Sequence, residues 1–226
     1  MDCRRLTAAA GLAGLALVVF AACSPADDKS DGWVKLFNGK DLTGWRAFVD
    51  PKKQVEPDQV WSVKDGVLVC QGVPYGYVLT EKDYGDYVLR VQWRWGEKQA
   101  GKNRNSGVFV HVSGPDKIWP KGVEAQLLAG RAGDIWLVDG FKLKVDPARQ
   151  DPKVSRHYFH LQDGVEKPLG EWNQYEITCA GDQIKLVVNG TLQNEASGAE
   201  ATRGKILLQS EGAEIHFRNI ELKPLK

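Results

Sequence analysis

Apolar and polar positions alternate along the chain beyond residue 30, in short runs separated by turn residues. Between 87 and 95 the odd positions are apolar and the even positions are mostly polar. Successive side chains of a strand point to opposite faces of a sheet, so this alternation predicts a strand with one face against a core. Runs at 60–63 and 67–70 flank Asp65-Gly66, a pair typical of a tight hairpin turn. The same part of the sequence shows no convincing helical period.

This pattern predicts an all-β fold. Further strands are expected at 184–188, 205–210 and 215–221. Seven or more strands at this spacing favour a two-sheet antiparallel sandwich of jelly-roll type, and a closed barrel is the alternative. The segment 139–168 differs because it is polar, contains several prolines and shows little periodicity. A long loop of this kind often forms the lid or rim of a site.

The N-terminus has the layout of an export signal. Two arginines precede an apolar run from Leu6 to Ala22, and the next residue is Cys23. Small residues directly before a cysteine resemble a bacterial lipobox, although Phe20 stands where Leu is usual. The sequence therefore indicates that Cys23 becomes the acylated N-terminus of the mature protein.

These features divide the chain into three parts. We expect a signal peptide over 1–22, a flexible tether over 23–31 that is lipidated at Cys23, and a single β domain over 32–226. The protein is then exported and anchored by lipid to a membrane of the cell envelope, where it faces the periplasm or the cell surface. A soluble periplasmic protein is the second interpretation. A spanning helix is the third, since the apolar run is at the short end of the spanning range.

The charge balance excludes one class of partner, and the cysteines leave two alternatives open. The 30 lysines and arginines balance 29 acidic residues to a net charge of +1. This balance provides no basic field, so no nucleic-acid partner is predicted. Cys70 and Cys179 both fall in predicted strands. They either form a disulfide, which an oxidising compartment permits, or remain two separate buried thiols.

Polar residues of unusual type gather on single faces of the predicted strands. Glu124 and Gln126 share one side of a strand, and Asn105 and His111 share one side of another. If the strands form one sheet, its outer face gathers carboxylates, amides, an imidazole and a guanidinium, which are groups that bind sugar hydroxyls. Taken singly, each residue is explained better as the solvated side of an antiparallel sheet. The set favours a site, because Glu and amides occur without interspersed lysines; its later members are Gln209, Glu211 and Arg218.

Two tryptophans are candidate sugar platforms. Trp136 and Trp172 lie beside loops, whereas the tryptophans within predicted strands are expected to pack in the core or at its edge. His157 and His160 have a spacing that would share a metal only on a helical turn, and no third ligand is evident. A surface loop explains them better. No cofactor is predicted, no metal site is assigned, and a requirement for a divalent metal is left open.

The β domain opens with the motif LFNGKDLTGW at 36–45. This motif and several others resemble the 3-keto-disaccharide hydrolase domain family. The resemblance implies a concanavalin-like jelly roll, related to lectins and glucanases, with a carbohydrate substrate and activity on oxidised sugars. Further matches span almost the whole mature chain: NSGV at 105–108, GVEAQL at 122–127, GDIW at 133–136, GEWN at 170–173, GKILLQ at 204–209 and FRNI at 217–220.

The sequence departs from the glucanase relatives on one strand. Those enzymes place their acids in a Glu-x-Asp-x-x-Glu pattern, whereas residues 124–129 here read EAQLLA. Two of the acids are missing, so a retaining mechanism with two carboxylates on this strand is not expected. A 3-keto sugar avoids that requirement, because its ketone acidifies the proton on C2 and lets the C1 substituent leave by β-elimination. Water then adds to the enone.

The resulting hypothesis is cleavage of the glycosidic bond of 3-keto-glycosides or 3-keto-disaccharides. Glu124 acts as base or acid, and His111 or Glu211 is its counterpart. A non-catalytic, lectin-like carbohydrate-binding module is the main alternative, and a scaffold or adhesin domain is the third. The side chains expected to orient the sugar are Asn105, Gln126, Gln209 and Arg218, with Lys167 reaching in from the loop.

Overall fold

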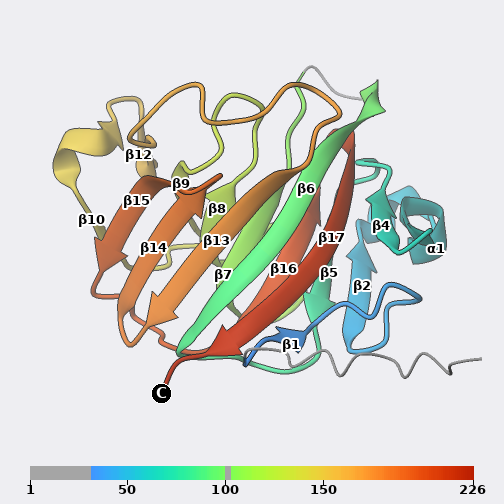
Figure 1. The fold of residues 1–226 in the computed structure, drawn as a ribbon, viewed down its shortest axis with the longest axis horizontal. Coiled ribbons are helices and arrows are strands. Elements are labelled where there is room, and N and C mark those ends of the chain that lie inside the picture. The colour runs from blue at the N-terminus through green and yellow to red at the C-terminus, as the bar shows by residue number, and fades with distance from the viewer. Residues whose placement is uncertain (1–31, 100–102) are drawn as a thin grey trace, which may run out of the picture.

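The computed structural model describes residues 32–99 and 103–226, and two antiparallel sheets face each other across one core (Figure 1). The predicted all-β sandwich is confirmed. The expectations for the signal peptide over 1–22, the tether over 23–31 and the lipidation of Cys23 lie outside the described residues. Among the described helices, none is long and apolar enough to cross a membrane.

Sheet A faces the viewer in Figure 1. Its strands follow the order β10 (Lys144–Val145), β15 (Thr191–Ser197), β14 (Gln183–Val188), β13 (Asn173–Ala180), β6 (Tyr87–Gln99), β17 (Ala213–Pro224), β4 (Val67–Cys70) and β3 (Trp61–Lys64), and β1 (Val34–Lys35) pairs with β17.

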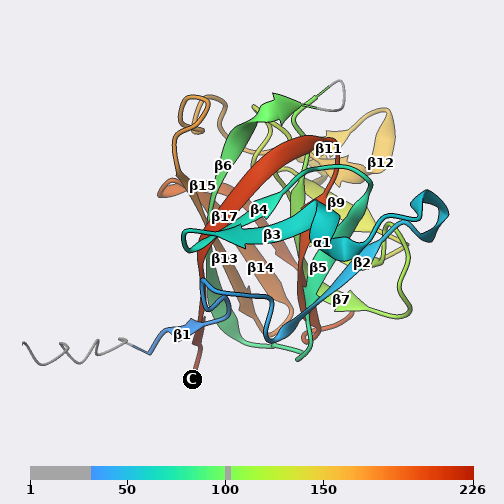
Figure 2. The ribbon, with the colours of Figure 1, turned by 90° about the vertical axis from the view of Figure 1, so that its right-hand side faces the viewer.

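Sheet B lies behind it. Its order is β11 (Gln150–Asp151), β12 (Val154–Tyr158), β9 (Ile135–Val138), β8 (Lys121–Gln126), β7 (Gly107–Ser113), β16 (Lys205–Ser210), β5 (Gly76–Thr80) and β2 (Trp45–Val49). The single-turn helix α1 (Pro57–Val60) contacts β2 of sheet B and β3 of sheet A, at the edge seen in Figure 2.

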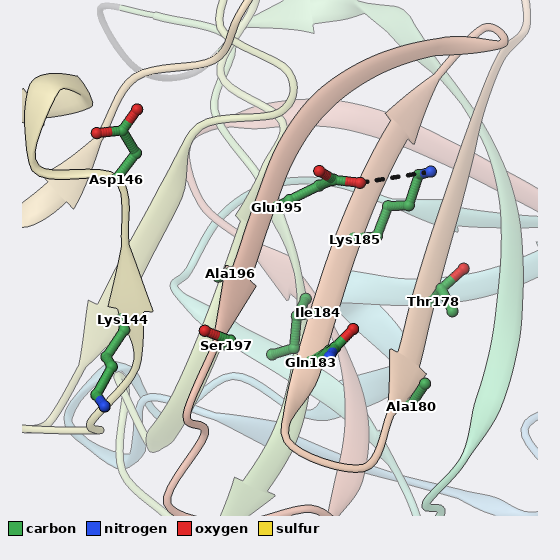
Figure 3. Close-up of a pocket in the computed structure, with 10 residues that line it drawn as sticks. All are labelled: Lys144, Asp146, Thr178, Ala180, Gln183, Ile184, Lys185, Glu195, Ala196 and Ser197. Atoms are coloured by element: carbon green, nitrogen blue, oxygen red, sulfur yellow. Dashed lines mark ion pairs between the residues drawn. The ribbon is translucent and has the colours of Figure 1, made fainter.

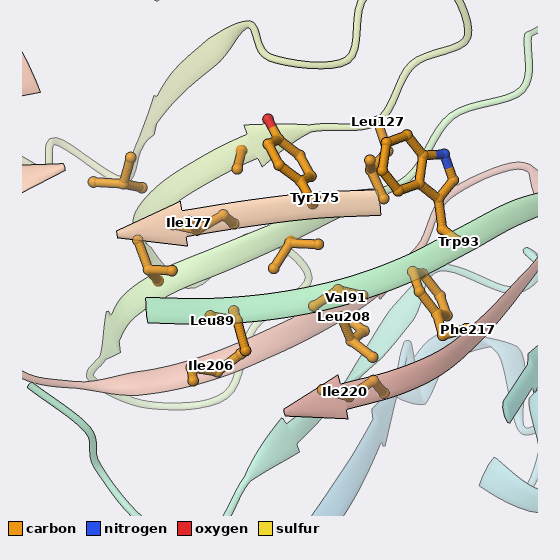
Figure 4. Close-up of a cluster of buried hydrophobic side chains, with 14 of the residues drawn as sticks. Leu89, Val91, Trp93, Leu127, Tyr175, Ile177, Ile206, Leu208, Phe217 and Ile220 are labelled. Carbon is orange, nitrogen blue, oxygen red and sulfur yellow. The ribbon is translucent and has the colours of Figure 1, made fainter. Parts of the chain in front are cut away.

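The core fills the space between the sheets, as the alternation along β6 predicts. Leu89, Val91 and Trp93 are fully buried there, whereas Arg90 and Gln92 lie on the outer face. Figure 4 shows side chains of both sheets meeting in this layer. Each large apolar side chain that is buried in this way contributes on the order of 1.5–3 kcal/mol to folding.

The segment 139–168 is more ordered than the sequence indicates. It contains β10, β11 and β12 and a 3₁₀ turn at Pro147–Arg149. β11 and β12 form a hairpin at one edge of sheet B, and β10 lies at one edge of sheet A. Strands of two to five residues at a sheet edge are too short to produce a visible alternation, which is why a loop was expected.

The two strand cysteines do not form a disulfide. Cys70 and Cys179 are free and buried. Ile215 of β17 pairs with Cys70 on one side and with Trp95 of β6 on the other, so Cys70 lies level with Trp95. Cys179 is opposite Tyr87, at the other end of β6. Positions 87 to 95 of an extended strand span about 26 Å. The interpretation as a disulfide is therefore wrong, and that of two separate buried thiols is correct.

Candidate active site

Neighbouring strands of sheet B bring the predicted polar residues to one outer face. In the pairing of β7 with β8, Phe109 is opposite Glu124 and Gly107 is opposite Gln126. β16 lies on the other side of β7 and carries Gln209 opposite Tyr77 of β5. The alternate residues of these strands fill the core, among them Val108, Ala125 and Leu208. The side chains of Glu124, Gln126 and Gln209 therefore point to the same outer face.

Glu124 lies at the centre of this face. Its side chain fits there because Gly107 has none: a Cβ at Gly107 would lie 2.5 Å from Glu124 Oε1 and 2.9 Å from its Cγ. Glu124 is 5% exposed. Burial raises the pKa of its carboxyl well above the usual range, the charge of Glu211 raises it further, and Arg156 acts in the opposite direction. The raised pKa favours the protonated carboxyl, which can donate a proton.

Glu211 is the second acid of the face. It follows β16 directly and lies two positions beyond Gln209, so strand alternation directs both side chains to the same side. Burial raises the pKa of Glu211 to about 7, and Arg156 partly opposes this effect. Two nearby carboxyls with different pKa values provide an acid and a base at the same pH.

Three oxygen atoms on or beside this face lack a hydrogen-bond donor within the described part of the chain. Glu124 Oε1, Gln209 Oε1 and Asn105 Oδ1 are buried and have no hydrogen-bond partner among the described residues. Buried polar atoms are nearly always paired, so such a cluster of acceptors is typical of a ligand site. Gln126 is held differently, since its Oε1 accepts hydrogen bonds from the backbone N–H groups of Leu127 and Leu128 at 2.8 and 2.9 Å.

Trp136 and Arg156 border Glu124. Trp136 of β9 is opposite Glu124 in the sheet. Its ring stacks on that of His157, with centroids 4.1 Å apart, and the Arg156 guanidinium carbon lies 4.7 Å from the Trp136 centroid. With both partners against its ring, Trp136 positions Arg156 rather than offering an open platform. Arg156 is not among the residues predicted from the sequence, because the segment that carries it has no strand pattern.

A buried carboxylate holds this corner together. Asp134 Oδ2 lies 2.7 Å from His157 Nε2, and Asp134 Oδ1 accepts from the backbone N–H of His160 at 2.8 Å. The expectation of a surface loop is wrong for His157, which is buried within β12. His160 does lie in a loop, just after β12, but its side chain is only 4% exposed. In the described part of the chain, no group of three or more His, Cys, Asp or Glu side chains is arranged to hold a metal ion.

Comparison with known proteins decides the family. The model of the 3-keto-alpha-glucoside-1,2-lyase-like domain matches residues 32–223. The chain belongs to this family.

Relatives of the lyase-like domain agree with this assignment. A 3-keto-disaccharide hydrolase of Bacteroides thetaiotaomicron is 24% identical over 249 residues, which cover 87% of this chain and 79% of the relative. A crystal structure of a candidate glycosyl hydrolase from Parabacteroides distasonis is 26% identical, with a TM-score of 0.64 over 88% of this chain and 96% of the other. The β-glucanase of Bacillus licheniformis, at 15% identity and a TM-score of 0.53 over 86% and 97% of the two chains, shows the shared glucanase-type fold.

His111 does not lie on the outer face of sheet B that carries Glu124. The pairing of β7 with β8 shifts between Val110 and Ser113, and His111 has a φ of 55° there. A bulge of this kind breaks the alternation of side chains. The His111 ring is buried and stacks on Phe141 of the core, and burial lowers its pKa to about 4. The prediction that it shares a face with Asn105 is wrong.

Arg218 and Trp172 lie on the opposite side of the sandwich. Arg218 belongs to β17 of sheet A, where its Nε donates to Gln92 Oε1 at 2.8 Å. Its guanidinium carbon is 4.0 Å from the centroid of Trp172. Lys167 is exposed, and its backbone N–H donates to Asn173 at the start of β13 in sheet A. The prediction that Arg218 and Trp172 join Glu124 on one face is wrong, because Arg218 and its neighbour Trp172 lie on sheet A and Glu124 lies on sheet B.

A pocket on sheet A is a rival site. It has a volume of about 440 Å³ and is lined by residues from β10, β13, β14 and β15 (Figure 3). Two of its four charged residues, Lys185 and Glu195, pair at 3.5 Å, with side chains 49% and 59% exposed. Exposed pairs of this kind are solvated and contribute little. The buried, unpaired acceptors and the raised pKa values favour the face of sheet B.

Proposed function

We propose that this protein cleaves the glycosidic bond of 3-keto-glycosides or 3-keto-disaccharides on the outer face of sheet B. The observation that carries the proposal is the pair of Glu124 and Glu211, whose pKa values are raised to different extents on one face. Family membership supports the class of substrate, and the unpaired acceptors of Gln209 and Asn105 support the binding of hydroxyl groups.

The reaction proceeds by elimination and hydration. Ionised Glu211 takes the proton from C2 of the sugar, which the C3 ketone acidifies. The electron pair of that C–H bond forms the C1–C2 double bond while the C1–O bond breaks, and Glu124 gives its proton to the leaving oxygen. Water then adds to C1 and a proton returns to C2, so the products are the free 3-keto sugar and an alcohol.

Arg156 is suited to the charge that develops in this reaction. Its positive charge acts on both Glu124 and Glu211, so it lies near the two carboxyls. Abstraction of the C2 proton places negative charge on the C3 oxygen, and a fixed cation stabilises such an enolate. The Trp136 ring holds the guanidinium in place.

The decisive experiment replaces Glu124 by Gln. This change keeps the shape of the side chain and removes the transferable proton, so turnover of a 3-keto-glucoside should fall by about 10²–10⁴-fold. Glu195→Gln, the same substitution in the pocket on sheet A, is the matched control and should leave turnover unchanged. Product formation is followed by chromatography and folding by circular dichroism. Undiminished turnover by folded Glu124→Gln protein would remove Glu124 from the mechanism.

A carbohydrate-binding module is the second candidate function. It is favoured by the stretch that begins in β8, where Gln126 and Ala129 stand at the two positions that carry further acids in the glucanases. The same acceptors would then bind a glycan without proton transfer. Binding of 3-keto-glucosides by calorimetry, without any product, would support this function over the enzyme.

We also propose, from the sequence pattern alone, that Cys23 carries a lipid that holds the domain at the cell envelope. Two acyl chains or more give stable anchoring, because each buried methylene contributes about 0.8 kcal/mol. The Cys23→Ser variant should move from the membrane fraction to the soluble fraction, and a variant that stays in the membrane fraction contradicts the proposal.

A further inference from the structure

Two large aromatic side chains are exposed side by side at the rim of the candidate active site. Tyr75, just before β5, is 41% exposed, and Trp119, in the connection between β7 and β8, is 43% exposed. Their ring centroids are 5.8 Å apart in an edge-on arrangement. Val73 is a further exposed apolar side chain of this segment, at 42%. Large apolar side chains grouped on a surface mark binding sites more often than isolated ones do.

The connection that carries Trp119 is fixed across the outer face of sheet B. Asp116 accepts hydrogen bonds from Arg46 at 2.6 and 2.8 Å and from the Tyr77 hydroxyl at 2.8 Å. Lys117 forms an ion pair with Asp139, which directly follows β9. Because strands β2, β5 and β9 all hold this connection, Trp119 has a defined position next to Tyr75.

Tyr75 and Glu211 adjoin neighbouring strands at one end of sheet B. Ser210 is opposite Gly76 in the pairing of β16 with β5, and Ser210 Oγ donates to the Pro74 carbonyl at 2.9 Å. The next residues along the two chains are Glu211 and Tyr75. Both residues directly adjoin the paired ends of β16 and β5, and neighbouring strands are about 4.8 Å apart. Glu211 and Tyr75 therefore lie at the same end of adjacent strands of sheet B.

An apolar pocket continues from Tyr75 away from Glu211. Its volume is about 490 Å³, and Val55, Val73, Pro74 and Tyr75 form most of its wall, with Asp50 and Lys53 as its polar members. β5 lies between β16 and β2 in the sheet, and Asp50 directly follows β2. The order across the sheet is therefore Glu211, then Tyr75, then the pocket.

We propose that Tyr75, Trp119 and this pocket bind the leaving group of the substrate, and that they take an apolar alkyl or aryl aglycone rather than a second sugar. This inference rests on the proposed function, because it uses Glu124 and Glu211 as the place where the C1–O bond breaks. The hydroxyls of a second sugar would find few partners beside Val55, Val73 and Pro74, and unpaired polar groups weaken binding. An alkyl chain there loses contact with water, which is favourable.

The test compares methyl and hexyl 3-keto-glucosides. Their leaving alcohols have nearly the same acidity, so a difference in kcat/KM reports binding of the chain rather than the chemistry of departure. The wild-type protein should cleave the hexyl compound with a kcat/KM at least tenfold higher. Trp119→Ala and Tyr75→Ala should reduce this preference to about threefold or less. Val34→Ala is the matched control, since Val34 is an exposed apolar residue on β1 of sheet A and should not change the preference.

The outcomes separate the two proposals. Cleavage of both glycosides with equal kcat/KM overturns the apolar subsite and leaves the proposed function standing. A hexyl preference that persists in folded Trp119→Ala and Tyr75→Ala proteins also overturns it. Cleavage of neither glycoside by the wild-type protein refutes the proposed function, and the subsite falls with it. A higher kcat/KM for a 3-keto-disaccharide than for the hexyl compound shows that the subsite takes sugar, and it overturns this inference as well.

Discussion

Glu211 sets the pH dependence of the proposed reaction. A base must be ionised, and burial raises the pKa of Glu211 to about 7. We therefore expect kcat/KM for a 3-keto-glucoside to rise with pH and to reach half of its upper value near pH 7. Rates measured across pH 5 to 9 at constant ionic strength check this expectation. A midpoint near pH 4.5, the usual value for glutamate, would show that another group is the base.

Ionisation of Glu211 should lower the free energy of unfolding as the pH rises, whereas it raises kcat/KM. A raised pKa means that the folded state binds the proton more tightly than the unfolded state, so the contribution of Glu211 is favourable below about pH 4.5 and is lost as the pH rises through 7. Glu211→Gln should therefore increase the free energy of unfolding at pH 8 by roughly 1–3 kcal/mol, after allowance for its partial exposure. At pH 4.5 the same variant should differ little from the wild type in urea unfolding.

Gly107 is expected to affect catalysis only by leaving room for the carboxyl of Glu124. Its φ is not in the left-handed region, so alanine suits the backbone, but the new Cβ would lie 2.5 Å from Glu124 Oε1. Gly107→Ala should displace the carboxyl and lower kcat by about 10²-fold or more. When it is added to Glu124→Gln, the further loss should be less than about threefold, because residues that act as a unit are not additive. Two independent, multiplying losses would contradict this explanation.

Residue identities were easier to predict than residue orientations. Glu124, Gln126 and Gln209 share a face because regular alternation holds along β8 and β16. His111 does not, because a bulge adds one residue to β7 and turns the imidazole toward Phe141. Nothing in the local sequence marks that bulge, which is visible only in the pairings of β7 with β8 and β16.

At the scale of elements, strand β12, the second strand from the edge of sheet B, depends on one buried carboxylate. Burial alone would raise the pKa of Asp134, but hydrogen bonds from His157 and His160 outweigh burial and lower it. Asp134→Asn should reduce the free energy of unfolding by roughly 2–4 kcal/mol, because the amide cannot replace the charge that both imidazoles contact. Turnover should fall too, since β12 carries Arg156.

Local measurements distinguish this role from a general loss of stability. Hydrogen exchange of the amides in β12 should accelerate more in Asp134→Asn than that of β6, which lies in the middle of sheet A. Asp163→Asn is the control, because Asp163 bonds His160 at 2.8 Å but its side chain is 94% exposed. It should change stability by less than about 0.5 kcal/mol. Equal acceleration in β6 and β12 would contradict a local role for Asp134.

Element prediction failed where strands are short and lie at edges. The long strands β6 and β17 show alternation over many residues and were predicted from it. β11 and β12 are two and five residues long, and the pairing of β12 with β9 depends on contacts such as His157 to Trp136. The sequence pattern of such strands cannot be told from that of a polar loop, so Arg156 was missed.

At the scale of the whole molecule, periodicity tells which side chains share a face of a strand but not which sheet the strand joins. Glu124 and Arg218 both lie on outward faces, as alternation predicts, yet β8 belongs to sheet B and β17 to sheet A. The choice of sheet depends on pairings between residues far apart in the chain, such as Phe217 with Trp93. The fold class follows from the number and spacing of strands, whereas only the part of the site that lies on β7, β8 and β16 follows from alternation.

The arrangement of the two sheets also fixes the state of the cysteines. Cys70 and Cys179 lie on strands with β6 and β17 between them and at opposite ends of β6, so neither can reach the other in the folded chain. Burial raises the pKa of each thiol to about 12, which suppresses the reactive thiolate.

In a chain with Cys3→Ser and Cys23→Ser, a thiol reagent should label neither cysteine in native protein and both in denaturant without reductant. Addition of reductant should leave the unfolding midpoint unchanged, because no disulfide constrains the unfolded state. Labelling in denaturant that appears only after reduction would show that the two cysteines are bridged.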